Sequence, residues 1–146
     1  WRTTAGGSGM INIRFQVPGE PKAKARPRVT RSGIAFTPKG TVLYENLVRT
    51  SFQQSYPDHV PLDCEMQAII TAYFSIPKSV SNKKRELMSF GLINPTKKPD
   101  LDNIAKAILD SLNGIAYKDD SQIVSLLISK KYSDRPRVEI TLKERA

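Results

Sequence analysis

Two hydrophobic periods run along this chain, and they separate its predicted strands from its predicted helices. Apolar and polar residues alternate over 11–17 and stop at Pro18 and Gly19, which is typical of a half-buried strand that enters a turn. Residues 66–76 are rich in β-branched and aromatic side chains and end at Pro77, so they predict a well-buried strand. The other predicted strands are a small hairpin at 29–36 and two C-terminal strands at 123–131 and 137–142.

A helical period marks three other stretches. Residues 38–55 predict a helix with Thr37 as its cap. Its apolar residues recur at near-helical spacing, at Val42, Leu43, Leu47, Val48 and Phe52. Ser81 is suited to cap a short helix, and we expect Phe90 on its apolar side to pack in the core rather than wedge into a partner. Residues 102–113 predict a strongly amphipathic helix.

This order of elements predicts a single α+β domain on a mixed or antiparallel sheet with two to three helices. Residues 1–9 are small, polar and glycine-rich and precede Met10, so we interpret them as a disordered tag remnant and place the domain at 10–146. A lone cysteine, Cys64, excludes an intramolecular disulfide. No apolar run approaches the roughly 18 residues of a membrane span. No secretory pattern opens the chain either, so we expect a cytoplasmic protein without a membrane partner.

Positive charge dominates the composition. The 146 residues include 23 Lys and Arg against 14 Asp and Glu, a formal net charge of +9, which favours a polyanionic partner such as nucleic acid. Pro21 and Pro27 prevent a regular helix over 19–31, so its cations are expected along an extended arm that follows a phosphate backbone. The candidate DNA contacts are Lys22, Lys24, Arg26, Arg28 and Arg31, together with Lys97 and Lys98. The alternative is a flexible basic loop that contacts nothing.

Acidic residues are concentrated in one segment of this basic chain, residues 100–120. Asp100 and Asp102 lie where an extended stretch meets a helix, and carboxylates two residues apart on extended backbone point to the same side. Such a pair is costly unless a cation neutralises it, and carboxylate oxygens suit Mg²⁺, or Mn²⁺, better than softer metals. A helix of about 18 Å and an extended return of about 20 Å would let Asp120 reach back to the pair. The spacing therefore permits a three-carboxylate metal site.

Lys106 lies four residues after Asp102, on the helix face that also carries Asp110. A cation there could offset the negative charge that develops on a phosphate in its transition state. Structural alternatives stay open for each residue. Asp100 or Asp102 could simply be the N-cap of the helix. Lys106 could form an ordinary surface ion pair with Asp102 or Asp110. Asp119 and Asp120 could simply form a turn.

The complete string at 97–124, KKPDLDNIAKAILDSLNGIAYKDDSQIV, resembles the signature of the RusA family of Holliday-junction resolvases. The resemblance covers the D-L-D-N opening, a lysine four residues after the second aspartate, L-D-x-L in mid-helix and D-D before a strand. It implies that Asp100, Asp102 and Asp120 are catalytic, Mg²⁺-binding carboxylates and that Lys106 is the functional lysine. Matching positions with supporting roles are Asn103, Asp110 and Asp119.

The resemblance implies a metal-dependent endodeoxyribonuclease, bacterial or phage-encoded, that resolves four-way or branched DNA by paired symmetric nicks in recombination and repair. Water activated by the metal would attack the scissile phosphorus, with Lys106 offsetting charge, and leave 5′-phosphate and 3′-hydroxyl ends. Family members act as homodimers, which suits two symmetric cuts. Two alternatives stay open: a non-enzymatic DNA-binding or architectural protein, and a nuclease for forks or flaps.

Overall fold

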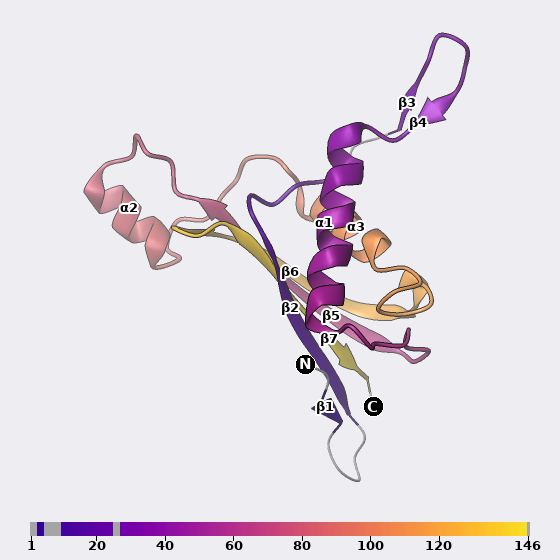
Figure 1. The fold of residues 1–146 in the computed structure, drawn as a ribbon. Coiled ribbons are helices and arrows are strands. Elements are labelled where there is room, and N and C mark those ends of the chain that lie inside the picture. The colour runs from indigo at the N-terminus through magenta and orange to yellow at the C-terminus, as the bar shows by residue number, and fades with distance from the viewer. Residues whose placement is uncertain (1–2, 5–9, 25–26, 146) are drawn as a thin grey trace.

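The computed structural model describes residues 3–4, 10–24 and 27–145, which are arranged around one central sheet (Figure 1). Its strands are β1 (Thr3–Thr4), β2 (Ile11–Pro18), β5 (Met66–Ser75), β6 (Ile123–Ser133) and β7 (Arg137–Glu144), in the order β1-β2-β7-β5-β6. The helices are α1 (Lys39–Ser55), α2 (Asn82–Ser89) and α3 (Leu101–Ser111), with a 3₁₀ turn, η1, at Asp120–Gln122. A separate hairpin is formed by β3 (Arg28–Val29) and β4 (Ala35–Phe36).

The sheet is mixed. β5 pairs with β6 in parallel and with β7 in antiparallel register, and β2 pairs antiparallel to β7. A parallel pair needs a crossover connection, and the chain supplies it between β5 and β6, through α2 and α3. The predicted α+β class with a mixed sheet and three helices is therefore confirmed, and the candidate aspartates lie on the crossover.

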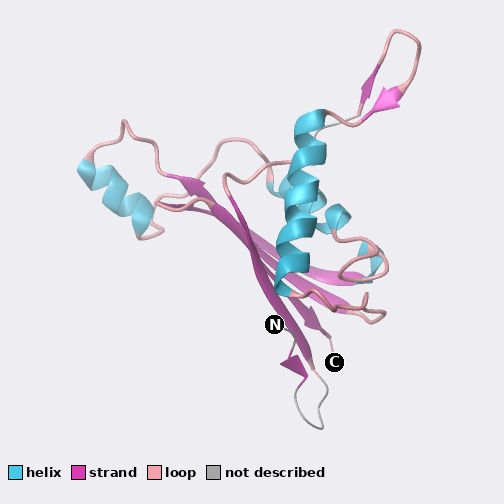
Figure 2. Ribbon diagram, viewed as in Figure 1, coloured by secondary structure: helices cyan, strands magenta, loops and turns pink. Residues whose placement is uncertain are grey.

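One side of the sheet is covered by α1 and α3 (Figure 2). α1 packs against β2 and α3, and α3 also contacts β6. Phe52 of α1 meets Phe15 edge-on and stacks on Tyr56, with ring centroids 5.3 and 5.4 Å away. Ile104 and Ile108 of α3 are fully buried. Burying side chains of this size stabilises the fold by about 1.5–3 kcal/mol each, so α3 is a firmly anchored support for the polar residues on its outer face.

α2 corrects one expectation from the sequence. Ser81 caps this helix as predicted, because its hydroxyl accepts a hydrogen bond from the Lys84 amide. Phe90, however, was expected in the core and is 73% exposed. The helix stands at one end of the molecule, where it contacts β6, and Met88 is its one buried residue. α2 packs through Met88 alone, and Phe90, which follows the helix, remains in contact with solvent.

α1 corrects a second expectation, because it is turned about its axis relative to the face that the apolar pattern marks. Val42, Leu43 and Leu47 are exposed. The buried positions are instead Thr41, Tyr44, Glu45, Val48, Ser51 and Phe52. Tyr44, Val48 and Phe52 are spaced four apart, and a stripe with two aromatic rings removes more apolar area from water than the aliphatic stripe does.

The leader before Met10 is described only at Thr3 and Thr4, whose backbone pairs with Ile11 and Asn12 as β1. Its other positions lie outside the described residues, so the interpretation of 1–9 as a disordered tag remnant stays a prediction. Each described helix is too short or too polar to span a bilayer.

Candidate active site

α3 has a buried apolar face and an exposed charged face, and the candidate catalytic residues Asp102 and Lys106 lie on the charged face. Ile104 and Ile108 point into the core, whereas Asp102 and Lys106 are exposed one turn apart on the outer face. Asp100 is the N-cap residue, and its carbonyl accepts the Ile104 amide at 3.0 Å while its side chain makes no capping bond. A helix N-terminus attracts negative charge, so it favours an anionic side chain or a phosphate here.

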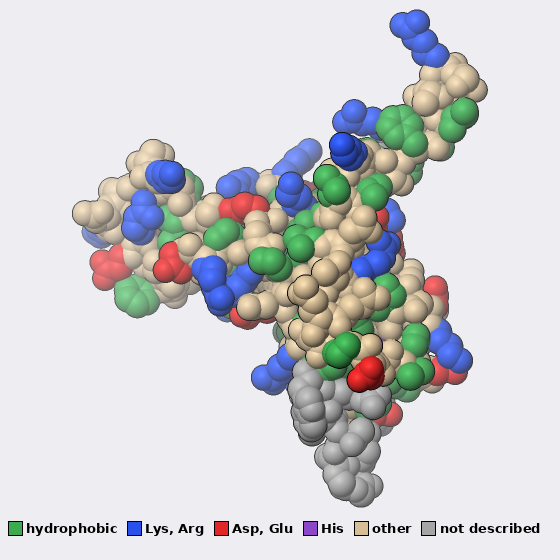
Figure 3. Space-filling model, viewed as in Figure 1, with side chains coloured by type: hydrophobic (Ala, Val, Ile, Leu, Met, Phe, Trp, Pro, Cys, Tyr) green, Lys and Arg blue, Asp and Glu red, His purple; other side chains and the backbone are tan. Residues whose placement is uncertain are grey.

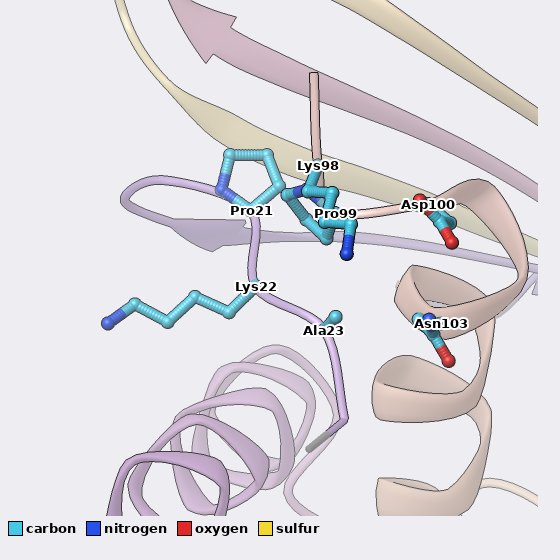
Figure 4. A pocket seen from close by; sticks show the side chains of 7 residues that line it. All are labelled: Pro21, Lys22, Ala23, Lys98, Pro99, Asp100 and Asn103. Carbon is cyan, nitrogen blue, oxygen red and sulfur yellow. The ribbon is translucent and has the colours of Figure 1, made fainter. Parts of the chain in front are cut away.

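Two adjoining cavities lie between α3 with the residues before it and a segment of residues 21–24 and 27, which we call the basic arm. The larger, of about 660 Å³, is lined by Lys24, Pro27, Asp100, Asp102, Asn103, Lys106 and Asp110. The smaller, of about 430 Å³, is lined by Pro21, Lys22, Ala23, Lys98, Pro99, Asp100 and Asn103 (Figure 4). Because Asp100 and Asn103 line both, the cavities form one polar site in which acidic and basic side chains face each other.

Asp120 lies at the other end of α3. Its amide donates to Asn113 Oδ1 at 2.8 Å, which holds η1 against the end of the helix. Partial burial raises the pKa of Asp120, and a hydrogen bond with the Asp110 carboxyl raises it further. Asp119 instead accepts from Ser121, which lowers the pKa of Asp119, and acts as the cap of η1. Asp120 is therefore paired with Asp110, whereas Asp119 has a local structural role.

The carboxylates thus fall into two pairs rather than one triad. Asp100 and Asp102 form a first pair in the larger cavity. Asp110 lines the same cavity about 12 Å farther along the helix axis than Asp102, and its carboxyl meets that of Asp120. Among the described residues, no three His, Cys, Asp or Glu side chains are placed to hold one metal ion. The structure does not bring Asp120 to the first pair, and the three-ligand assignment stays a prediction.

The first pair does fit a hard divalent cation by its donor chemistry. Asp100 and Asp102 offer carboxylate oxygens, and Asn103, which lines the same cavity, carries an amide oxygen. Mg²⁺ is commonly held by one or two carboxylates together with waters and substrate phosphate oxygens, so two acidic ligands are enough.

Lys24 is the candidate DNA contact that the structure places most clearly. Its ammonium lies 2.9 Å from Asp110 Oδ2 and 3.6 Å from Glu45 Oε2, and its amide donates to the Asn103 carbonyl at 3.2 Å. The hydrogen bond to Asp110 raises the pKa of Lys24, although desolvation opposes the shift. Glu45 was not predicted from the sequence, although its position three residues before the buried Val48 puts it on the inner face of α1.

The other candidate DNA contacts are spread over a wider surface. The side chain of Lys22 extends away from Asp100 and Asn103 (Figure 4). Arg28 and Arg31 are exposed on the projecting hairpin. Further candidates are Lys98, which lines the smaller cavity, Lys97, whose ammonium is 5.8 Å from the Phe74 ring, and Arg26, which lies outside the described residues. Lys and Arg side chains gather along the edge of the molecule between α2 and the hairpin (Figure 3).

Two comparisons with known proteins cover the residues of this site. The family model described as "Endodeoxyribonuclease RusA" matches residues 18–143, which include the basic arm, α3 and η1. The "Uncharacterized protein YqaN" of Bacillus subtilis (strain 168) is 41% identical over 137 residues, which cover 90% of this chain and 96% of that protein. The family predicted from residues 97–124 is therefore confirmed over most of the chain.

Proposed function

Because the chain belongs to the RusA endodeoxyribonuclease family, we propose that it resolves Holliday junctions by paired, symmetric, Mg²⁺-dependent nicks. The observation that carries this proposal is the polar site on α3, where Asp100 and Asp102 share a cavity with Lys106 and the basic arm. Recombination and repair, in the host or in a phage cycle, are the processes that would need such cuts, and the cytoplasm is the compartment expected for them.

The chemistry assigned to this site is phosphodiester hydrolysis. Asp100 and Asp102, with Asn103 beside them, would hold the divalent ion, which supplies a bound water of lowered pKa and neutralises phosphate charge. Lys106 projects into the same cavity, so its ammonium would stabilise the charge that grows on the phosphate oxygens. Water would attack phosphorus as the bond between phosphorus and the 3′ oxygen breaks. The new P–O bond leaves a 5′-phosphate, and the 3′ oxygen takes up a proton and becomes a 3′-hydroxyl. Mn²⁺ has the same preference for oxygen ligands and should substitute.

Branched DNA is favoured as substrate by the distribution of charge. The basic edge runs from α2 to the projecting hairpin (Figures 1 and 3). Cations along such an edge contact phosphates and position the duplex without reading sequence. A four-way junction offers two duplex arms near one scissile phosphate, so it can contact both projecting elements at once.

A homodimer is supported by the apolar surface that the monomer leaves open. Val42, Leu43 and Leu47 of α1 are exposed beside a hairpin whose Val29, Ile34 and Phe36 are exposed as well. Exposed apolar residues that form a contiguous patch mark protein interfaces in soluble proteins. A two-fold axis through this surface would provide two copies of the site, as paired cuts in strands of like polarity require.

The decisive experiment incubates the full chain with a labelled four-way junction, with no divalent ion, with Mg²⁺, with Mn²⁺ and with Ca²⁺. We expect nicks at symmetric positions in opposite strands with Mg²⁺ or Mn²⁺, and no product without a divalent ion. An excess of unlabelled linear duplex should compete poorly, and fork and flap substrates should be cut more slowly than the junction. Preferred cutting of forks or flaps would reassign the substrate, and junction binding without nicks in every metal would favour a purely DNA-binding role.

A further inference from the structure

Among the described residues of the basic arm, Lys24 is the one whose ammonium forms an ion pair with acidic side chains. Lys24 and Lys22 are two residues apart and belong to the same basic stretch, yet the structure separates them. The side chain of Lys22 is exposed and extends away from Asp100 and Asn103 (Figure 4), so it is open to a phosphate. The ammonium of Lys24 is already engaged by two carboxylates, those of Asp110 and Glu45.

The carboxylates that hold Lys24 come from two different helices. Asp110 lies on α3 at 2.9 Å from the ammonium, and Glu45 lies on α1 at 3.6 Å. The backbone adds a third attachment, because the Lys24 amide donates to the carbonyl of Asn103 in the first turns of α3. One residue therefore joins the arm, α1 and α3, and it contacts two other residues that line the larger cavity, Asn103 and Asp110.

Glu45 explains why this cation is needed inside the protein. Its side chain is only 12% exposed, and among the described residues Lys24 is the one cation within 4.0 Å of it. A buried carboxylate without a partner is strongly unfavourable, so Glu45 retains the Lys24 ammonium. A phosphate that recruited Lys24 would have to displace two carboxylates and leave Glu45 unpaired, whereas a phosphate that recruited Lys22 would displace neither.

We infer that Lys24 is a positioning residue rather than a phosphate contact: it fixes the basic arm to α3 so that the arm forms one wall of the cavity that holds Asp100, Asp102 and Lys106. This role rests on the proposed nuclease function. Through Lys24, the position of Asp110 is fixed, and with it the position of Asp120, whose carboxyl meets that of Asp110. The basic arm thus has two functions: Lys24 anchors it to α3, and Lys22 contacts DNA.

The test compares Lys24→Met with Lys22→Met, a matched loss of one charge on the same arm. Junction affinity is measured without divalent ion across a range of salt, and the cleavage rate is measured in single turnover with protein in saturating excess. We expect Lys24→Met to lower the saturated rate by about 10- to 100-fold, as misplaced catalytic groups do, with an unchanged salt slope. Lys22→Met should instead weaken binding and reduce the slope of log affinity against log salt by about 0.9.

Two further variants separate positioning from misfolding. Lys24→Arg keeps the charge and should retain most of the rate. Lys24→Met combined with Glu45→Gln relieves the unpaired buried carboxylate, so thermal stability should recover while the cleavage rate stays low. Recovery of the full rate in the double variant would overturn the inference, because it would show that only folding had been impaired.

A readout without DNA keeps this inference distinct from the proposed function. Hydrogen exchange of the residue 24 amide, followed by NMR in the free protein, should be slow in the wild type and at least about tenfold faster in Lys24→Met, since the bond to Asn103 is no longer supported by the ion pairs. Equal exchange in both proteins, or a salt slope reduced as in Lys22→Met, would refute anchoring. Failure of the wild type to cut junctions would refute the proposed function but leave this measurement valid.

Discussion

α1 and α3 pack side by side, yet they differ in how well the pattern of apolar residues predicts which face of the helix is buried. α3 buries its apolar residues and exposes its charged ones, so its pattern alone identifies the face that carries the candidate chemistry. α1 buries Glu45 and exposes Leu43 and Leu47. A departure from amphipathic order within a well-packed domain indicates contacts beyond the local sheet. For the inner face of α1 this contact is a cation from the basic arm, and for the outer face we propose the second copy of a homodimer.

The largest expected effect is on the free energy of unfolding, when an apolar residue of each helix is replaced by alanine. Ile104 on α3 is fully buried, so Ile104→Ala should lower the free energy of unfolding by about 2–5 kcal/mol in urea titrations. Leu43 on α1 is 59% exposed, and Leu43→Ala in dilute, monomeric protein should change it by less than about 0.5 kcal/mol. Similar losses for both variants would mean that the outer face of α1 is part of the monomer core.

The outer face of α3 should respond in catalysis and not in folding. Asp102→Asn removes a charge from an exposed side chain, so the free energy of unfolding should stay nearly constant. Junction cleavage with Mg²⁺ should fall by about 100-fold or more, while junction affinity changes little. Asp134→Asn, in the exposed turn between β6 and β7, is the matched control and should cut normally. Undiminished cleavage by Asp102→Asn would remove this residue from the site.

The sequence pattern predicted α3 well because its apolar period and its cap residue are both local features of the sequence. Ile104 and Ile108 recur with the helical period, and Asp100 is suited to the cap. The location of Asp120 depended on a tertiary contact. The chain between them is long enough for Asp120 to reach Asp100. The Asp120 amide is instead bonded to Asn113, and the Asp120 carboxyl meets that of Asp110. Spacing sets an upper limit on distance and does not choose among partners within reach.

The errors on α1 and α2 have the same origin. The face of α1 is chosen by Tyr44 and Phe52, whose rings fill the space over the sheet, and no aliphatic period reveals that choice. Phe90 is exposed because α2 packs through one residue, which depends on where the crossover leaves the sheet. Hydrophobic period predicts that a helix forms, but its rotation is decided by neighbours that are distant in sequence.

The exposed stripe of α1 gives the next prediction. If α1 and the hairpin form a two-fold interface, a charge at Leu43 would be repeated on both copies and left without a partner. We expect Leu43→Asp to weaken dimerisation by at least about tenfold in analytical ultracentrifugation. Thr50→Asp introduces the same charge at another exposed position of α1 and should leave the dimer intact. A wild-type chain that stays monomeric at high concentration would exclude this interface.

The inner face of α1 gives a prediction for stability. Lys24→Met leaves Glu45 unpaired in a mostly buried position, so the free energy of unfolding should fall by about 1–3 kcal/mol, and Glu45→Gln in the same chain should restore part of it. Lys22→Met, with its exposed side chain, should change it by less than about 0.5 kcal/mol.

The pH dependence of this contribution has a definite sign. The pKa of Lys24 is raised above its usual 10.5, chiefly by the hydrogen bond to Asp110, so the folded state binds the lysine proton more tightly than the unfolded state. The stabilisation from Lys24 is therefore fully present below pH 10.5 and is lost as the pH rises through the raised pKa. Urea titrations of wild type and Lys24→Met should converge above that pH. A constant difference there would mean that the destabilisation by Lys24→Met does not come from the loss of the lysine charge.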